Sequence, residues 1–218
     1  MHDEPKKFLM KKLMIVILIG LSATTLTAQH ISIGPSVGIG QNWLNTDVNS
    51  SGKNLFHPSY NIGGKLVYSI LSNWGVSADV KFSGEGGSRG VDNSNKTVNR
   101  INFLRIPIQG IYFFGKYGDR VRPKISIGPS FGFVLGGKQK VISNGQTISE
   151  IANKDYFNKL DIGVNAAAGA NIRISKSTWL NADLTYYHGL TDISKAAGKL
   201  QQRGIGINVG VLFPFGAN

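Results

Sequence analysis

Apolar residues alternate with small or polar residues in eight separate stretches of the sequence, and this period of two is its most restrictive feature. The first stretch has apolar side chains at Ile31, Ile33, Val37 and Ile39, and the last runs from Ile205 to Phe215. The apolar positions of the six stretches between them begin at Tyr60, Trp74, Leu104, Ile125, Ile162 and Leu180. Alternation of this length predicts β-strands with one apolar and one polar face. Eight such strands can form a soluble sandwich, a soluble barrel or a membrane barrel.

The composition of the two faces separates these alternatives. One face is built from Ile, Val, Leu and aromatic residues, and the other from Gly, Ser and Asn with a few charges. A membrane barrel turns large apolar side chains toward lipid and keeps a polar lumen, whereas a soluble barrel encloses them. The stretches reach about 10 residues, as a tilted strand needs to cross a bilayer, whereas soluble strands average about 5–6. We therefore predict an all-β fold, an eight-stranded antiparallel up-and-down transmembrane β-barrel.

The connections between the stretches support this fold. Long and short connections alternate along the chain, over residues 44–57, 71–73, 84–98, 115–121, 137–156, 175–178 and 189–202. Outer-membrane barrels have short periplasmic turns and long external loops. The order predicts an outer-membrane protein with both termini periplasmic and four long loops external.

Glycine makes up 28 of the 218 residues, and its placement follows the two faces. Alternation puts Gly64 and Gly110 on the apolar face. It puts a larger set on the polar face: Gly34, Gly38, Gly40, Gly63, Gly75, Gly128, Gly132, Gly136, Gly163, Gly169, Gly204, Gly206 and Gly210. Small residues there predict a narrow lumen that a few large side chains fill.

Aromatic residues gather near the expected strand ends, as in the two interfacial girdles of membrane barrels. One group lies toward the short connections: Trp74, Trp179, Phe114, Phe213 and Phe215. The other lies toward the long connections: Trp43, Tyr60, Phe82, Phe133 and Tyr186. Aromatic residues are also enriched in ordinary strands, which is the alternative explanation.

Two prolines interrupt the strands. Pro35 and Pro129 lie inside the first and fifth stretches, each in the sequence Gly-Pro-Ser. Proline cannot donate to a strand ladder, and a closed barrel has no free edge. We therefore expect a β-bulge at each proline.

The N-terminus has the features of a secretory signal peptide. Lys6, Lys7, Lys11 and Lys12 precede the apolar run from Leu13 to Leu21, and small and polar residues follow up to Gln29. The alternative is a membrane anchor helix, but such a helix needs about 20 apolar residues. We assign residues 1–29 to a cleaved signal peptide and residues 30–218 to the barrel domain, with Met10 as an alternative start.

Several motifs of the barrel region form a set. They are residues 103–108 (FLRIPI), 125–132 (ISIGPSFG), 161–165 (DIGVN), 168–170 (AGA) and 187–193 (YHGLTDI). With a signal that ends in Thr27-Ala28-Gln29, they resemble the small PorT-like outer-membrane barrels of the Bacteroidota over essentially the whole mature chain. The resemblance implies a barrel of OmpA or OmpX shape, and more weakly a type IX-like secretion-accessory role. The chain departs from the usual aromatic terminus, because Gly216, Ala217 and Asn218 follow Phe215.

Few residues suggest chemistry. The absence of cysteine excludes disulfides, thiolate zinc sites, cysteine nucleophiles and acylated lipoproteins. Residues 132–138 have P-loop spacing, but Gln139 replaces the required Ser or Thr and no helical pattern follows. His30, His57 and His188 lack metal-ligand spacing. His188 could act as the base of a lipid hydrolase, yet no serine motif accompanies it. We predict that the protein is not an enzyme and has no catalytic, cofactor or metal site.

Charged residues on the polar face predict a network inside the barrel. Alternation places these large polar side chains in the lumen: Lys65, Asp79, Lys81, Arg105, Gln109, Lys124, Arg173 and Asp183. An eight-stranded barrel is just wide enough inside for side chains, and a buried charge must be paired or hydrated. We expect a plug of ion pairs and hydrogen bonds. The alternative is a path for protons or ions.

The chain is basic, with a formal net charge of +12, and it has no nucleic-acid-binding motif. Basic residues lie in the expected external loops: Lys138, Lys140, Lys154, Lys159, Lys195, Lys199 and Arg203. They suit the phosphates of outer-leaflet lipids, or form a solvated surface. The expected partners are outer-membrane lipid and lipopolysaccharide, the barrel-assembly machinery during insertion, and secretion-system components, but no nucleic acid. Residues 137–156 are the best candidate for recognition, because loops on rigid scaffolds carry binding.

Three functions are compatible with these features. The favoured one is a non-catalytic outer-membrane barrel with a structural, surface-binding or secretion-accessory role. The alternatives are a lipid-modifying enzyme of the outer membrane and a narrow channel for ions or small solutes.

Overall fold

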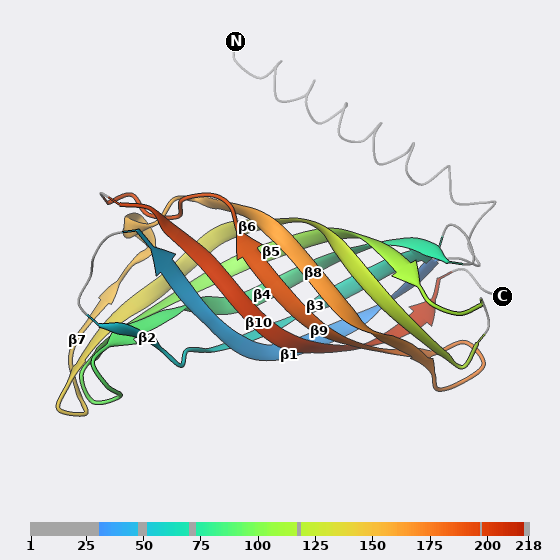
Figure 1. Cartoon of the computed structure of the whole chain (residues 1–218), viewed down its shortest axis with the longest axis horizontal. Helices are drawn as coiled ribbons and strands as arrows, with labels where there is room; N and C mark the ends of the chain where they lie inside the picture. The colour runs from blue at the N-terminus through green and yellow to red at the C-terminus, as the bar shows by residue number, and fades with distance from the viewer. Residues whose placement is uncertain (1–30, 48–51, 70–72, 117–118, 197, 216–218) are drawn as a thin grey trace, which may run out of the picture.

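The computed structural model describes residues 31–47, 52–69, 73–116, 119–196 and 198–215. Within these ranges the chain is nearly all strand (Figure 1). The elements are β1 (Ile31–Thr46), β2 (Lys53–Leu55), β3 (Pro58–Ser69), β4 (Trp74–Gly90), β5 (Lys96–Phe113), β6 (Val121–Ser143), β7 (Gln146–Ala152), a 3-10 turn (Lys154–Tyr156), β8 (Leu160–Arg173), β9 (Trp179–Gly189) and β10 (Leu200–Pro214). The expected signal peptide, residues 1–29, lies outside the described residues.

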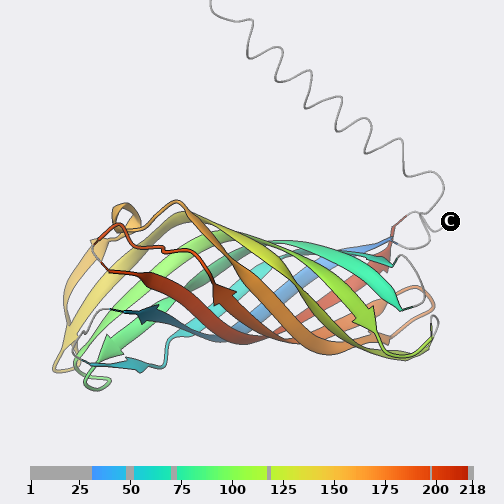
Figure 2. The same cartoon turned by 45° about the horizontal axis from the view of Figure 1, so that its top comes forward.

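Eight of the described strands close into a ring. Each pairs antiparallel with its neighbours in the order β1, β3, β4, β5, β6, β8, β9, β10, and β10 pairs back onto β1. The two short strands lie outside the ring, with β2 on the end of β4 and β7 on the end of β6. The strands run obliquely around the barrel (Figure 2). This confirms the predicted eight-stranded up-and-down barrel.

The two ends of the barrel differ. At one end lie the last residues of β3, β5 and β8, together with the start of β1 and the end of β10, where the Phe215 N–H donates to the Ile31 carbonyl over 2.8 Å (Figure 1). We call this the short-turn end. At the other end lie the β4–β5 and β6–β7 hairpins and the short strand β2; we call it the hairpin end. In the described part of the chain no helix is long and apolar enough to cross a membrane.

Alternation places the apolar side chains on the outer wall. Ile39, Ile62 and Ile127 are 72%, 58% and 63% exposed, whereas Ser36, Lys65 and Ser130 on the opposite face are buried. A folded chain with this much exposed apolar surface needs an apolar surrounding to cover it. The outer wall is therefore the lipid-facing wall.

Two of the expected long loops are largely strand. The connection predicted over residues 84–98 is wrong, because β4 continues to Gly90, β5 starts at Lys96, and Gly90 pairs with Lys96. Within residues 137–156, β6 continues to Ser143 and pairs with β7. The turn between them is Asn144-Gly145, both with positive φ (51° and 78°), as a tight two-residue hairpin requires.

The expected bulges at Pro35 and Pro129 are also wrong. Residue pairs on either side of Pro35 keep one register, since Ile33 faces Phe213 and Ser36 faces Gly210. Pro129 faces Val164 in the unshifted register of β6 and β8. The ladder therefore tolerates each missing N–H without inserting a residue.

Apolar residues close both ends of the lumen. At the hairpin end Leu44, Ile101, Phe103, Val134, Phe157 and Ile193 form a buried cluster. At the short-turn end Val67, Ile111, Phe113 and Leu212 form another, against which Trp179 packs. Trp179 is thus an inward residue, as its parity with Asn181 and Asp183 requires, and its assignment to the girdle is wrong. Trp74 does lie on the outer wall, with its ring centroid 5.0 Å from that of Tyr112.

Inward glycines leave room for the neighbouring strand. A Cβ atom on Gly63 would collide with the Val80 carbonyl oxygen and lie 2.7 Å from the Lys81 Cα. A Cβ on the adjacent, outward Gly64 would meet nothing closer than the Gly34 carbonyl oxygen at 3.9 Å. The inner wall of a narrow barrel is more crowded than the outer wall, which explains the one-sided placement of glycine.

This contrast gives a matched pair of substitutions. We expect Gly63→Ala to lower the free energy of unfolding by about 2 kcal/mol, the typical cost of forcing an extra methyl group into a packed site. Gly64→Ala should leave it unchanged or raise it slightly. Urea titration of the barrel in phospholipid vesicles, followed by tryptophan fluorescence, measures both. Equal losses for the two variants would contradict the crowding argument.

Candidate functional site: the charged lumen

A chain of alternating charges crosses the middle of the lumen. Lys81 Nζ lies 3.2 Å from Asp79 Oδ2, and Lys65 Nζ lies 3.4 Å from Asp79 Oδ1. The same Lys65 Nζ is 3.5 Å from Asp183 Oδ2, and Lys124 Nζ is 2.6 Å from Asp183 Oδ1. All five side chains are at least nine-tenths buried. Because they come from β3, β4, β6 and β9, the chain ties strands on different sides of the ring.

A second cluster centres on Arg105, nearer the hairpin end. Its guanidinium donates to both carboxylate oxygens of Glu85 over 2.7 Å each, and to Asp161 Oδ2 over 3.0 Å. The Tyr187 hydroxyl donates to the same Asp161 oxygen over 2.8 Å. Arg105 also lies against two aromatic rings, 4.7 Å from the centroid of Phe103 and 4.1 Å from that of Tyr187. The paired fork geometry and the stacking hold this guanidinium in one position.

The two clusters together are electrically neutral. Four cations (Lys65, Lys81, Lys124 and Arg105) face four anions (Asp79, Asp183, Glu85 and Asp161).

Six of these eight residues are among those that alternation placed in the lumen. Glu85 and Asp161 were missed, because Glu85 lies in the stretch taken for a loop and Asp161 precedes the stretch that begins at Ile162. Parity could have found both, since Glu85 follows Lys81 and Ser83, and Asp161 precedes Gly163 and Asn165.

The other two residues placed in the lumen by alternation lie apart from these ion pairs. Gln109 is buried, and its side-chain amide donates to the Asn165 carbonyl over 3.2 Å. Arg173 is half-buried at the short-turn end, with its guanidinium carbon 5.8 Å from the centre of the Trp179 ring. Arg122, a buried arginine that was not expected, lies 4.0 Å from the centre of the Phe113 ring.

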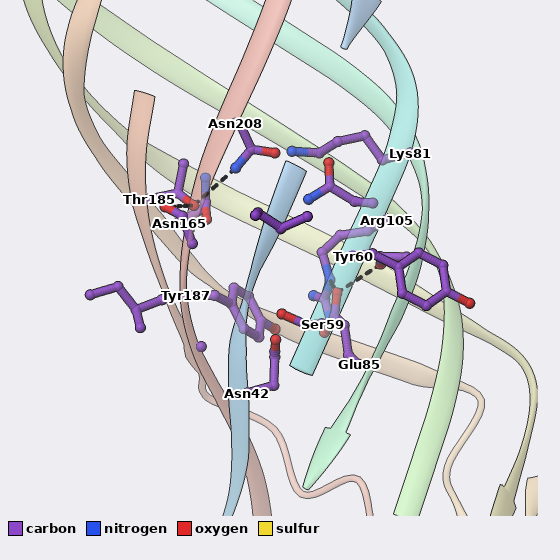
Figure 3. Close-up of a pocket in the computed structure, with 16 residues that line it drawn as sticks. Asn42, Ser59, Tyr60, Lys81, Glu85, Arg105, Asn165, Thr185, Tyr187 and Asn208 are labelled. Carbon is purple, nitrogen blue, oxygen red and sulfur yellow. Dashed lines mark hydrogen bonds and ion pairs between the residues drawn. The ribbon is translucent and has the colours of Figure 1, made fainter. Parts of the chain in front are cut away.

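A small polar cavity adjoins both clusters. It has a volume of about 70 Å³, and Lys81, Glu85, Arg105 and Tyr187 line it together with Asn42, Ser59, Asn61, Asn165, Thr185 and Asn208. Lys81 and Asn208 point toward one another across it (Figure 3). A cavity of this size and lining accommodates a few water molecules. It is too small for a substrate of the size that ordinary ligand pockets hold, about 300 Å³ or more.

His57 lies at the hairpin end, beyond the apolar rows of the outer wall. Its Nδ1 is 3.0 Å from Ser88 Oγ and its Nε2 is 3.3 Å from the Glu85 carbonyl oxygen. A neutral ring with its proton on Nε2 satisfies both contacts. Burial, as the larger cause, and the nearby Arg100 cation together lower the pKa of His57 to about 4. His57 therefore connects the start of β3 to the end of β4 through these two hydrogen bonds.

His188 lies on the outer wall. It shares the outward parity of Tyr186, whose hydroxyl is 3.3 Å from His188 Nδ1. The neighbouring Tyr187 points into the lumen instead. Among the described residues, no group of three His, Asp or Glu side chains is arranged as metal ligands.

An eight-stranded antiparallel barrel with an apolar outer wall and an ion-paired lumen is a small outer-membrane β-barrel protein. The chain belongs to the outer membrane protein beta-barrel domain family, whose sequence profile matches residues 19–195. Its place is therefore the outer membrane.

Several solved structures resemble this chain at low sequence identity, and the one with a TM-score above 0.5 supports the fold. Neisserial surface protein A (NspA) is 14% identical with a TM-score of 0.51, over 85% of this chain and 97% of that chain. Outer membrane protein W of E. coli is 12% identical with a TM-score of 0.43, over 84% and 98%. Ail, the attachment invasion locus protein of Yersinia pestis, is 16% identical with a TM-score of 0.42, over 85% and 99%. A comparison with curated protein sequences gave no match.

The lumen pairs have a measurable consequence. Replacing Asp183 by Asn leaves the Lys65 and Lys124 ammonium groups without their shared counter-charge. We expect the free energy of unfolding to fall by about 3 kcal/mol or more, the usual cost of breaking a buried pair from one side. Asp155→Asn, in the exposed 3-10 turn, is the control and should change little. Urea titration in phospholipid vesicles compares the two, and equal stabilities would show that the Asp183 pairs contribute nothing.

Proposed function

We propose that the protein is a non-catalytic, solute-tight outer-membrane barrel that presents its hairpins at the cell surface, with both termini periplasmic. The filled lumen carries this proposal. A solute on the barrel axis would meet the Leu44 cluster, then the Arg105 cluster, then the lysine–aspartate chain, and finally the Phe113 cluster. Opening a path would separate buried charges or remove packed side chains, and both are costly.

The environment of the candidate base supports a non-catalytic role. A hydrolase needs a nucleophile within hydrogen-bond reach of its base. The hydrogen-bond partner of His188 is the Tyr186 hydroxyl on the outer wall, and Thr191 is occupied with Asp161 and the main chain of Ile162. This arrangement suits an interfacial histidine better than a general base.

A secretion-accessory role of the PorT-like kind is our finer proposal. Its support is the resemblance of residues 103–108, 125–132, 161–165 and 187–193 to that group. The β6–β7 hairpin is the candidate contact element, because all seven residues of β7 are exposed and, among the described strands, β7 pairs with β6 alone. A rigid hairpin that stands beyond the barrel wall suits the capture of a partner.

The filled lumen predicts that the protein does not conduct ions. We expect the purified protein in planar lipid bilayers to give no discrete conductance steps, because the ion pairs and both apolar clusters stay in place under voltage. A porin added afterwards to the same bilayer should give steps and so prove that the membrane reports them. Regular steps from the protein alone would favour the channel alternative.

The partner role predicts selective co-purification. Secretion-system components should be recovered with the tagged protein from native membranes. In the matched variant, residues 141–149 are replaced by Asn-Gly, which joins the paired Lys140 and Glu150 by a two-residue turn and keeps the ring intact. We expect it to insert normally but to lose those components. Recovery of barrel-assembly proteins alone, by both forms, would contradict the secretion role.

A further inference from the structure

The outer wall changes from apolar to basic within a few residues at the hairpin end. Phe82, Leu104 and Phe133 lie side by side on β4, β5 and β6 and face outward. Two residues further along β5, Asn102 faces outward, and two residues beyond it stands Arg100. Since a strand rises about 3.4 Å per residue, Arg100 follows the last apolar row by roughly 14 Å along a tilted strand. This is the region where headgroups replace hydrocarbon.

Two lysines of β6 share this basic region with Arg100. Lys138 is the direct partner of Arg100 in the ladder, and Lys140 is the partner of Val98. Ile101 is completely buried in the lumen, so its neighbour Arg100 points outward, as does Val98 two residues before it. Lys138 and Lys140 point outward as well, because they are the ladder partners of these two residues. The Lys138 and Lys140 side chains remain 67% and 45% exposed.

The charges of the region do not cancel. Glu150 of β7 accepts from Lys138 over 2.7 Å and lies 3.1 Å from Lys140 Nζ, so one carboxylate serves two ammonium groups. Arg100 donates to the Pro58 carbonyl over 3.2 Å and lies 5.7 Å from the centre of the Tyr60 ring. Both contacts orient the guanidinium without neutralising it. Three cations and one anion leave an excess of two positive charges.

The same side chains border a groove. It has a volume of about 390 Å³, and Tyr60, Arg100, Asn102, Lys138, Lys140 and Glu150 line it. The groove thus offers cationic donors, an amide and an aromatic ring, next to an apolar wall. That combination matches a molecule with a phosphate, a polar sugar and a hydrocarbon part.

We propose that this groove binds the phosphate group of an outer-leaflet glycolipid of the lipid A type, with Arg100, Lys138 and Lys140 as the phosphate-binding residues. The proposal rests on the proposed orientation, which puts the hairpin end in the outer leaflet. A lipid is favoured over a soluble anion because the basic rows continue directly from the rows of Phe82, Leu104 and Phe133, on which acyl chains lie. Arginine and lysine are the usual binders of phosphate, by forked and point-charge contacts respectively.

Native mass spectrometry of the detergent-solubilised barrel tests the site. The probes are bis-phosphorylated lipid A, enzymatically dephosphorylated lipid A and inorganic phosphate. The test variant is Arg100→Gln, Lys138→Gln and Lys140→Gln together. The matched control is Lys154→Gln, Lys159→Gln and Lys195→Gln, which removes three exposed cations from other segments of the hairpin end. Heat-modifiable migration on gels verifies that each variant is folded.

We expect the wild type and the control to retain bis-phosphorylated lipid A and the test variant to bind it at least about tenfold more weakly, given the contribution of each basic residue near lipid phosphates. Dephosphorylated lipid A should bind the wild type as weakly as lipid A binds the test variant. Unchanged binding by the test variant, equal loss in the control, or equal binding of the dephosphorylated lipid would overturn the proposal. So would displacement of the lipid by millimolar inorganic phosphate, which would indicate a soluble-anion site.

Binding in detergent does not depend on how the barrel is oriented in a cell. Protease added to whole cells tests orientation separately, through cleavage of the β6–β7 hairpin. Lipid binding without cleavage would reject the proposed orientation and keep the phosphate-binding groove. Cleavage without lipid binding would keep the proposed orientation and reject the phosphate-binding groove.

Discussion

A sheet of eight strands that closes on itself leaves an interior about as wide as its own side chains, and a charge buried inside it must be paired or hydrated there. Asp79 and Asp183 satisfy this requirement by sharing Lys65 between them, and Arg105 satisfies it by holding Glu85 and Asp161 at once. These side chains are long, and the inner wall has space for them because glycine occupies so many of the remaining inward positions. Glycine and the ion pairs are thus two parts of one solution to a narrow lumen.

The same constraint separates the lumen into layers. Charges gather in the middle, where strands on different sides of the ring come within reach of one another, and apolar side chains such as Phe103 and Phe113 fill the two ends. The end clusters keep bulk water away from the pairs and so strengthen them, since Coulomb attraction grows as the local dielectric falls. The pairs in turn hold the strands that support the end clusters. A barrel built this way gains rigidity from its contents, which suits a scaffold for hairpins better than a conduit.

Alternation was enough to predict the eight strands and most of the charged lumen, because the direction of a strand side chain depends only on its parity. The closed ring and its lipid-facing wall also required the composition of the two faces and the order of long and short connections. The prediction failed where a segment was assigned to a loop from its composition and not from the parity of its side chains. Residues 84–98 are rich in Gly, Ser and Asn and were taken for a loop, yet small residues are what a narrow lumen needs, and Glu85 was lost with them. Asn144-Gly145 is a hairpin signal in its own right and marks the turn of β6 and β7. The contact of Arg105 with Asp161 of β8 depends on the stagger of strands that are not neighbours in the ring, so no local pattern specifies it.

The paired charges of the lumen contribute nothing to the net charge of the chain. Because the eight charges of the two clusters cancel, the net charge of +12 is carried by the other residues of the chain. Strand β5 connects the two regions, since it turns Ile101, Phe103 and Arg105 inward and Arg100, Asn102 and Leu104 outward. A slip of one residue would exchange these faces, placing the Arg105 guanidinium in lipid and Leu104 among carboxylates. The bidentate contact of Arg105 with Glu85 therefore favours the observed register of β5 against β4, which sets Leu104 beside Phe82 and Arg100 beside Gly86.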